Sequence, residues 1–426
     1  MAVACRTEPA AFDLELRQAL RQQKIEPLFR PDLNQDQVEL GEKLFFDKIL
    51  SGNRDLSCSG CHHPTLAASD KIPLSIGTKG EGLGPTRVVI NGAARTPRHS
   101  PEIFNRGYQS VTAMFWDSRV EKLPDGSLVA PQEVPVNVKT ALAAQAMFPV
   151  LSREEMRGQA GDIGKEGAPN ELALLDDNDP EAIWAALMTR VLSFERYADL
   201  FAVAFPTVPT NQLNFGHAAT AISAYETSAF TLLNSPWDQY VAGDDLALSD
   251  AAKRGALLFF GEARCASCHS GNLFSDQQHY NIAAPQISLS GALDVGREGV
   301  TGDLNDRFAF RTPALRNVTV TGPYLHNGAF ADLRDVVKHH LDPQGSLQQY
   351  DPTQLGPSLL GAFISDDETQ TTLLSSLDPL LQNAPTLSEA QLNELLAFLA
   401  SLEDPVAHLV FTIVPEFVPS GLPTDY

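Results

Sequence analysis

Apolar residues recur at helical spacing in two segments that end in the same short pattern. One segment ends in GEKLFF at residues 41–46, and the other ends in GALLFF at residues 255–260. Asn34 or Asp36 precedes the first segment and Ser249 precedes the second, and residues of these types commonly cap helix N-termini. We therefore expect each pattern to close a helix, as part of an internal repeat.

A third helical pattern lies near the end of the chain. Ser388 and Gln391 form an S-x-x-Q capping box, and the apolar-rich sequence LNELLAFLASL follows. We expect this helix to pack against the helix that ends at residue 260 and so to close the second copy of the repeat.

Elsewhere the pattern indicates helices that are joined by long loops. Residues 177–205 and 212–233 read as helices, whereas strand signals are few and short, as at residues 317–321. The Gly- and Pro-rich stretches 76–101 and 157–170 predict long loops, which in a compact protein are often functional. The fold class we expect is therefore mainly α.

The repeat divides the chain into two domains, and 426 residues are enough for two ordinary cores. We expect an N-terminal segment over residues 1–20 and a first domain over residues 21–235. A second domain should cover residues 236–404, and a Pro-rich tail over residues 405–426 should lie extended on a domain surface.

Composition and charge narrow the function classes. Hydrophobic residues make up 43% and charged residues 20% of the chain, as in globular proteins. The net charge of −22 argues against nucleic acid or an anionic membrane as a partner. No apolar run reaches the roughly 18 residues of a membrane-spanning helix. The start MAVAC resembles the end of a lipoprotein signal, in which Cys5 would carry lipid; a plain thiol near a frayed terminus is the alternative.

Four of the five cysteines belong to two copies of the pattern C-x-x-C-H, which is the attachment signature of c-type haem. The residues are Cys58, Cys61 and His62 in the first copy, and Cys265, Cys268 and His269 in the second. The two thiols bind the haem covalently, and the histidine ligates its iron. A zinc knuckle, a redox dithiol or coincidence explains two such copies poorly. We therefore expect two haem c groups, each following a repeat helix as in a cytochrome c fold, and a periplasmic location, because haem c is assembled outside the cytoplasm.

The chain resembles the bacterial di-haem cytochrome c peroxidases and their relative MauG over residues 36–404. The matching segments are MFWDSR at 114–119, AQA at 144–146 with EM at 155–156, RTPALRNV at 311–318 and PYLHNG at 323–328. The resemblance implies a peroxidase with two packed cytochrome c-like domains, the first peroxidatic and the second transferring electrons.

The resemblance also implies roles for three residues. Glu155 would shuttle the proton during peroxide cleavage, because a partly desolvated carboxylate can have its pKa raised towards neutral. Gln145 would orient peroxide or water. Trp116 would relay electrons between the two haems, since an indole can be oxidised transiently.

The first departure from the family concerns the first haem. The di-haem peroxidases carry a removable histidine ligand in a loop that reads S-x-G-H-G, whereas this chain has SIGTKG at residues 75–80. Thr78 cannot take that role. We therefore expect an open first iron that reacts with peroxide without prior reduction, as in MauG.

The second departure concerns a calcium ion that the family binds between the domains. RHSP at residues 98–101 aligns with the family's R-N-x-P, so His99 replaces an asparagine ligand. Imidazole is a poor ligand for a hard cation. The backbone carbonyls of Thr321 and Pro323 could still contribute to a calcium site, and His99 could instead donate a hydrogen bond at the interface.

The third departure concerns the second haem, whose outer ligand is a Met in the peroxidases and a Tyr in MauG. All five Met residues here precede the second C-x-x-C-H motif. Counting from His326 of PYLHNG places the ligand position at His340, and the apolar residues three, four and seven positions earlier share its helix face. We therefore expect His340 to be the ligand and His339 to be solvated, with His339 as ligand the alternative. His326 should lie near this haem or the interface without being a ligand.

These expectations combine into one function. Hydrogen peroxide is reduced at the open N-terminal haem, with electrons supplied through a bis-His C-terminal haem by a small cytochrome c or a cupredoxin. Because imidazole in place of thioether lowers the reduction potential, a MauG-like enzyme whose high-valent haems oxidise aromatic residues of a partner protein is the alternative. A non-catalytic di-haem electron carrier is a third reading, which the Gln145–Glu155 pair disfavours. The residues leave open whether the protein is a homodimer.

Overall fold

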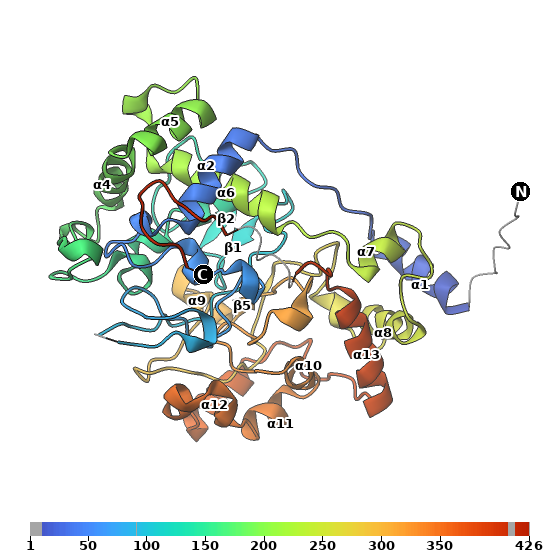
Figure 1. The fold of residues 1–426 in the computed structure, drawn as a ribbon. Coiled ribbons are helices and arrows are strands. Elements are labelled where there is room, and N and C mark those ends of the chain that lie inside the picture. The colour runs from blue at the N-terminus through green and yellow to red at the C-terminus, as the bar shows by residue number, and fades with distance from the viewer. Residues whose placement is uncertain (1–10, 91, 408–413, 426) are drawn as a thin grey trace, which may run out of the picture.

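The chain folds into helices joined by long irregular segments, with two small sheets (Figure 1). The structure is a computed structural model that describes residues 11–90, 92–407 and 414–425. The α-helices are α1 (Ala11–Gln22), α2 (Gln35–Phe46), α3 (Ala141–Gln145), α4 (Pro180–Leu192), α5 (Glu195–Ala204), α6 (Phe215–Phe230), α7 (Pro236–Val241), α8 (Asp250–Phe260), α9 (Glu298–Thr301), α10 (Leu333–Leu341), α11 (Pro343–Gln348), α12 (Asp367–Ser375) and α13 (Glu389–Ser401). The expected mainly α fold is confirmed.

The two sheets are antiparallel and short. Three strands pair in the order β1-β2-β3, and two further strands pair as β4-β5. The strands are β1 (Ala113–Met114), β2 (Val120–Lys122), β3 (Leu128–Val129), β4 (His279–Tyr280) and β5 (Phe310–Arg311). In the second sheet His279 lies opposite Arg311, so β5 brings the start of the RTPALRNV segment beside β4.

The predicted helix starts are confirmed. The side chain of Asn34 accepts a hydrogen bond from the Asp36 amide at the start of α2, with a nitrogen–oxygen distance of 2.9 Å. Ser249 caps α8 in the same way, and Ser388 and Gln391 form the capping box of α13. Each cap satisfies amide groups that have no partner within the helix.

One expectation about secondary structure is confirmed and another is wrong. The segment 177–205 is helical and forms the two helices α4 and α5. The expected strand at 317–321 is wrong, because Val318–Val320 forms the 3₁₀-helix η12. Asn317 adopts a left-handed conformation with φ of 62°, which an extended strand does not allow, and its side chain accepts a hydrogen bond from the Asp404 amide.

Two helix pairs form the centres of two separate cores. Helix α2 packs on α6, and a Cβ atom placed on Gly41 would lie 1.9 Å from the carbonyl oxygen of Ala221. Helix α8 packs on α13, and a Cβ atom on Gly255 would lie 1.9 Å from the carbonyl oxygen of Glu394. The glycine of each GxxLFF pattern therefore allows the backbones of each pair to touch.

The ends of the described chain cross over between the two cores. Helix α1, which the sequence did not reveal, packs into the core of α8 and α13 through Leu16 and Leu20. The tail places Val418 and Leu422 in the core of α2 and α6, and Figure 1 shows it beside these helices. Residues 1–10, which include Cys5, lie outside the described part of the chain, and within that part no helix is long and apolar enough to cross a membrane.

Candidate active site

The first C-x-x-C-H motif opens onto a cavity of about 1110 Å³. The motif follows α2 and begins with the 3₁₀-helix η2 (Cys58–Gly60), so the core helix fixes its position. Cys58, Cys61 and His62 all line this cavity. Burial lowers the pKa of His62 to about 4, which keeps its imidazole neutral, as a metal ligand must be. The three side chains fit the covalent attachment of one haem.

The same cavity carries the residues expected to handle peroxide. Gln145 ends α3, and Glu155 sits in a single π-helical turn, η6 (Arg153–Arg157). Burial raises the pKa of Glu155 above its ordinary value, while the nearby charge of Arg119 lowers it. The Arg119 guanidinium stacks on the ring of Phe115 at 3.6 Å. The structure thus brings a perturbed carboxyl, an amide and a cation to one cavity.

Thr78, at the position of the family's removable histidine, is buried in a hydrogen-bonded cluster. Its hydroxyl donates to the carboxylate of Asp55 at 2.8 Å and accepts from the amide of Asn53 at 2.9 Å. Its backbone N–H donates to the carbonyl of Glu155 at 2.8 Å. These bonds hold the loop against the turn that carries Glu155.

The second C-x-x-C-H motif lines a separate cavity of about 230 Å³. It follows α8 and begins with the 3₁₀-helix η10 (Cys265–Ser267). The cavity is lined by both motif cysteines, by His269 and, from helix α10, by His340. The ring centres of the two histidines are 6.3 Å apart.

The contacts of these two imidazoles fit one metal ion between them. Nδ1 of His269 bonds to the carbonyl oxygen of Phe274 at 3.0 Å, and Nδ1 of His340 bonds to that of Val336 at 2.7 Å. A ligating histidine usually donates its other ring N–H to such an acceptor, which leaves Nε2 for the metal. Two metal–nitrogen bonds of about 2 Å each, added to the ring radii, span a separation of this size. The donor set fits a haem with two imidazole ligands.

His339 is arranged differently, and the expectation that it is solvated is wrong. Its side chain is fully buried, with Nε2 bonded to the carbonyl of Ile282 at 2.8 Å and Nδ1 to the hydroxyl of Ser346 at 3.0 Å. Both ring nitrogens of His339 therefore have hydrogen-bond partners, while Nε2 of His340 has none among the residues that the structure describes. Helix α11, which carries Ser346, and the segment after β4, which carries Ile282, cover this side of α10, and the sequence pattern of α10 alone does not show this.

Trp116 lines both cavities. Its indole N–H donates to the carbonyl of His99 at 3.0 Å, and its carbonyl accepts from the Arg311 amide at 2.8 Å. Arg106 and Arg311 are also buried and also line both cavities, which the sequence did not predict. Their guanidinium groups could pair with haem propionates, since arginine matches carboxylates in geometry and charge.

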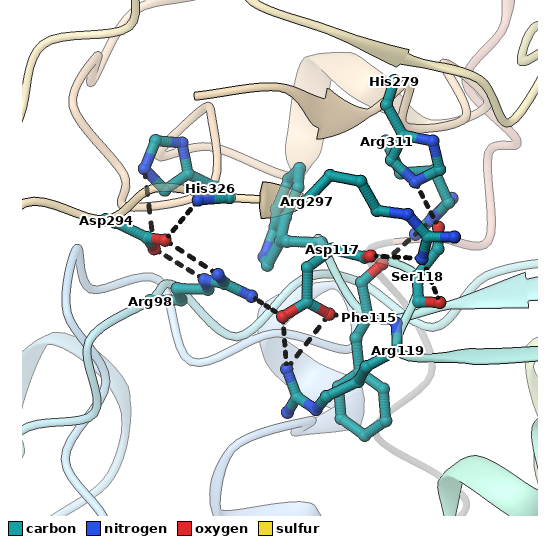
Figure 2. Close-up of polar contacts among 12 residues, drawn as sticks. Arg98, Phe115, Asp117, Ser118, Arg119, His279, Asp294, Arg297, Arg311 and His326 are labelled. Carbon is teal, nitrogen blue, oxygen red and sulfur yellow. Dashed lines mark hydrogen bonds and ion pairs between the residues drawn. The ribbon is translucent and has the colours of Figure 1, made fainter. Parts of the chain in front are cut away.

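A network of ion pairs and hydrogen bonds holds the segment that follows this tryptophan in the chain (Figure 2). Arg98 binds Asp294 at 2.6 and 2.8 Å and Asp117 at 2.5 Å. Arg297 donates to the backbone carbonyls of Asp117 and Ser118 at 2.9 and 2.7 Å. Asp117 and Ser118 of the FWDS segment are thus held by Arg98 and Arg297.

His326 and His99 lie beside this network. His326 stacks on Phe310 with ring centres 3.6 Å apart, and its Nε2 is 4.0 Å from the carboxylate of Asp294. His99 is buried, and its Nδ1 bonds to the carbonyl of Ile72 at 2.8 Å. The calcium ion expected at the carbonyls of Thr321 and Pro323 stays a prediction.

The sequence did not point to one further carboxyl group in the first cavity, that of Glu226. Glu226 on α6 lines the first cavity, is only 7% exposed, and its Oε2 has no hydrogen-bond partner among the described residues. Burial raises its pKa to about 8. A single charged residue within the otherwise uncharged sequence of α6 was the available signal.

Comparisons with known proteins agree with this geometry. Residues 35–246 match the family model described as di-haem cytochrome c peroxidase. Cytochrome c551 peroxidase of Pseudomonas aeruginosa is 31% identical over 308 residues, which cover 72% of this chain and 71% of that protein. Methylamine utilization protein MauG of Methylorubrum extorquens is 29% identical over 311 residues, covering 72% and 69%.

Solved structures show the same fold. A MauG-like protein associated with microbial copper homeostasis aligns with a TM-score of 0.62 and 25% identity, over 92% of this chain and 96% of that one. The di-haem peroxidase BthA from Burkholderia thailandensis aligns with a TM-score of 0.60 and 20% identity, over 89% and 88%.

Proposed function

The chain belongs to the di-haem cytochrome c peroxidase family, and on that premise we propose that it reduces hydrogen peroxide at the first cavity with electrons supplied through the second. The observation that supports this proposal is that one cavity brings together the first haem-attachment motif and polar side chains that can handle peroxide. Its lining includes Cys58, Cys61, His62, Arg119, Gln145 and Glu155. A haem held there would share its cavity with a proton-transfer group.

A bound haem c would supply the first cavity with a peroxide-binding iron and a reservoir of electrons. Glu155 would accept a proton from one peroxide oxygen and return it to the oxygen that leaves as water. Gln145 would orient peroxide by hydrogen bonding. Two protons and two electrons convert each peroxide molecule into two waters, and Arg119 would stabilise the Glu155 carboxylate between proton transfers.

Thr78 supports a first iron that is open at rest. Its hydroxyl is bonded to Asp55 and Asn53, and it is not among the residues that line the cavity. A loop fixed in this way would not need to move before peroxide enters. Peroxide would therefore react without prior reduction of the protein.

Trp116 would carry electrons between the cavities, because it lines both of them. The donor we propose is a small cytochrome c or a cupredoxin in the periplasm, where haem c proteins are assembled. His269 and His340 would ligate the second iron through their Nε2 atoms.

A second candidate is the oxidation of aromatic side chains in a partner protein. The observation that favours it is the pair of imidazoles at the second cavity, because two imidazole ligands give a lower reduction potential than imidazole with thioether. Sustained peroxide turnover with reduced cytochrome c or cupredoxin would favour the first candidate. Consumption of peroxide only once per enzyme molecule with every such donor would favour the second.

The proposal is tested by replacing Glu155 in the holoenzyme. We expect Glu155→Gln to slow the first reaction with hydrogen peroxide in stopped-flow experiments by about 10²- to 10⁴-fold, the range for a lost general acid–base group. The matched control is Glu154→Gln, which changes the exposed neighbouring carboxylate and should change the rate less than about threefold. Equal rates for Glu155→Gln and the wild type would overturn the proposed role.

A further inference from the structure

Tyr280 combines three properties at the edge of the second cavity. It lines this cavity, it is partly exposed to solvent, and its hydroxyl donates a hydrogen bond to the carboxylate of Asp276 at 2.7 Å. The backbone N–H of Asp276 donates to the carbonyl of Cys268 at 2.9 Å, which ties the backbone of Asp276 to the second C-x-x-C-H motif. Strand β4 fixes the backbone of Tyr280 opposite Phe310 on β5.

Tyr324 provides a contrast within the same cavity. It also lines the second cavity, but its hydroxyl donates to the backbone carbonyl of Val318 at 2.9 Å. A backbone carbonyl cannot take up a proton at ordinary pH, whereas a carboxylate can. Among the tyrosines of this cavity, Tyr280 is therefore the one with a proton acceptor in place.

We propose that Tyr280 and Asp276 form a redox site through which electrons enter the protein at the second cavity. Tyr280 would release one electron towards the second haem site and, at the same time, its phenolic proton to Oδ2 of Asp276. A one-electron donor outside the protein would then return an electron to Tyr280, and Asp276 would return the proton. The oxidant is hydrogen peroxide, as in the proposed function, on which this inference rests.

The chemistry of the phenol makes the carboxylate necessary. Burial and the hydrogen bond to Asp276 raise the pKa of Tyr280 above its ordinary value, so the phenol is protonated before oxidation. Loss of an electron makes a phenol strongly acidic, and a nearby base that takes the proton at once lowers the barrier. The partial exposure of Tyr280 would let the donor approach it directly.

The surroundings of Tyr280 suit contact with an external donor. Leu380 also lines this cavity and is 47% exposed, and Asp378 lies beside it in the cavity wall. An exposed apolar group next to acidic groups matches a small donor protein with basic residues around an apolar contact. Electrons from such a donor would reach Tyr280 before the buried parts of the cavity.

The experiment oxidises the holoprotein by two routes and follows tyrosyl radicals by freeze-quench EPR. One route is hydrogen peroxide, and the other is flash-quench oxidation with ruthenium trisbipyridine and a sacrificial acceptor, which needs no peroxide chemistry. Protein containing ring-deuterated tyrosine identifies the signal as tyrosyl by its narrower hyperfine pattern. We expect a tyrosyl signal in the wild type by both routes.

Three variants assign the signal. Tyr280→Phe should abolish it, and Asp276→Asn, which keeps a hydrogen-bonding group but accepts no proton, should slow its formation by about 10²-fold or more. Tyr324→Phe is the matched control and should leave the signal unchanged. Haem content and far-UV circular dichroism equal to those of the wild type show that each variant folds.

The outcomes separate this inference from the proposed function. A tyrosyl signal that persists in Tyr280→Phe, a wild type without a tyrosyl signal by either route, or an Asp276→Asn variant as fast as the wild type would overturn the inference. A wild type that does not react with peroxide but forms the Tyr280 radical by flash-quench would overturn the proposed function and leave the redox site standing.

Discussion

The two C-x-x-C-H motifs are presented by equivalent helix pairs but face different surroundings. Gly41 of α2 meets the Ala221 carbonyl of α6 just as Gly255 of α8 meets the Glu394 carbonyl of α13, with the same distance of 1.9 Å to an added Cβ atom. In the first cavity His62 shares the wall with Glu155 and Gln145. In the second, His269 faces His340 across 6.3 Å. The repeated helices would position each haem-attachment motif in the same way. The segments outside the repeat would then determine the different chemistry of the two haem sites.

The two helix pairs also differ at one equivalent position that faces the cavities. Tyr225 and Phe398 are the next contacts of Gly41 and Gly255, so the residues that follow them, Glu226 and Leu399, occupy equivalent places. Each of these two residues lines its own cavity. At this pair of positions the first cavity therefore contains a buried carboxyl where the second contains an isobutyl group.

The largest effect should come from making the second site resemble the first. His340→Ala removes one of the two imidazoles, so the second iron should lose its low-spin state entirely. Low-temperature EPR of the oxidised holoprotein should show a high-spin and a low-spin ferric signal in the wild type, and only high-spin signals in the variant.

The neighbouring histidine is the control for that change. His339→Ala removes a buried side chain with two hydrogen bonds, so it should lower the free energy of unfolding by about 2–3 kcal/mol while the low-spin signal persists. Loss of the low-spin signal in His339→Ala but not in His340→Ala would exchange the two assignments. Two low-spin signals in the wild type would mean that the first iron is not open.

The pairing of α8 with α13 and both attachment motifs could be predicted from the sequence because their signals are local, whereas the pairing of α2 with α6 was not predicted. Caps such as Asn34 and the GxxLFF pattern specify a helix end within a few residues. The burial of His339 could not be predicted, because it depends on the carbonyl of Ile282, which is distant in sequence. The same holds for the crossing termini and for the network of Arg98, whose partners lie far along the chain.

The next largest effect should be a loss of folding stability when the glycines at the close contacts of the two helix pairs are replaced. Gly41→Ala and Gly255→Ala each place a methyl group against a backbone carbonyl, so each should destabilise its own domain by about 3 kcal/mol or more. The loss of free energy of unfolding is measured by denaturant unfolding of the holoprotein, followed by the haem absorption. A substitution at Gly261, whose added Cβ atom would meet only the carbonyl of Leu257 at 2.8 Å, is the milder control.

The difference between Glu226 and Leu399 should appear as a dependence of stability on pH. The pKa of Glu226 rises from 4.5 to about 8 on folding, so the folded chain holds this proton more tightly than the unfolded chain. The resulting stability is fully present below pH 4.5 and is lost as the pH rises towards 8. Glu226→Leu should remove this loss, which amounts to at most about 3 kcal/mol at neutral pH.

The measurement is the free energy of unfolding at several pH values for wild type and variant. Glu226→Gln is the matched control, because it keeps the shape and polarity of the side chain but does not titrate. Both variants should lose less stability than the wild type between about pH 5 and pH 8. If only Glu226→Leu did so, packing rather than ionisation would be the cause.

The smallest effect should come from the crossing termini, which test whether the two domains are held separately. Lys48 of the 3₁₀-helix η1 (Lys48–Leu50) pairs with Asp425 of the tail at 2.7 Å, and Arg17 of α1 pairs with Asp245 at 2.6 Å. Asp425→Asn should cost about 1 kcal/mol because its partner is only 11% exposed, and the more exposed Asp245→Asn should cost less. Hydrogen exchange should rise around residues 47–63 in the first variant and around α8 in the second. A rise at both places in either variant would mean that the domains open together, and the independence of the two helix pairs would have to be abandoned.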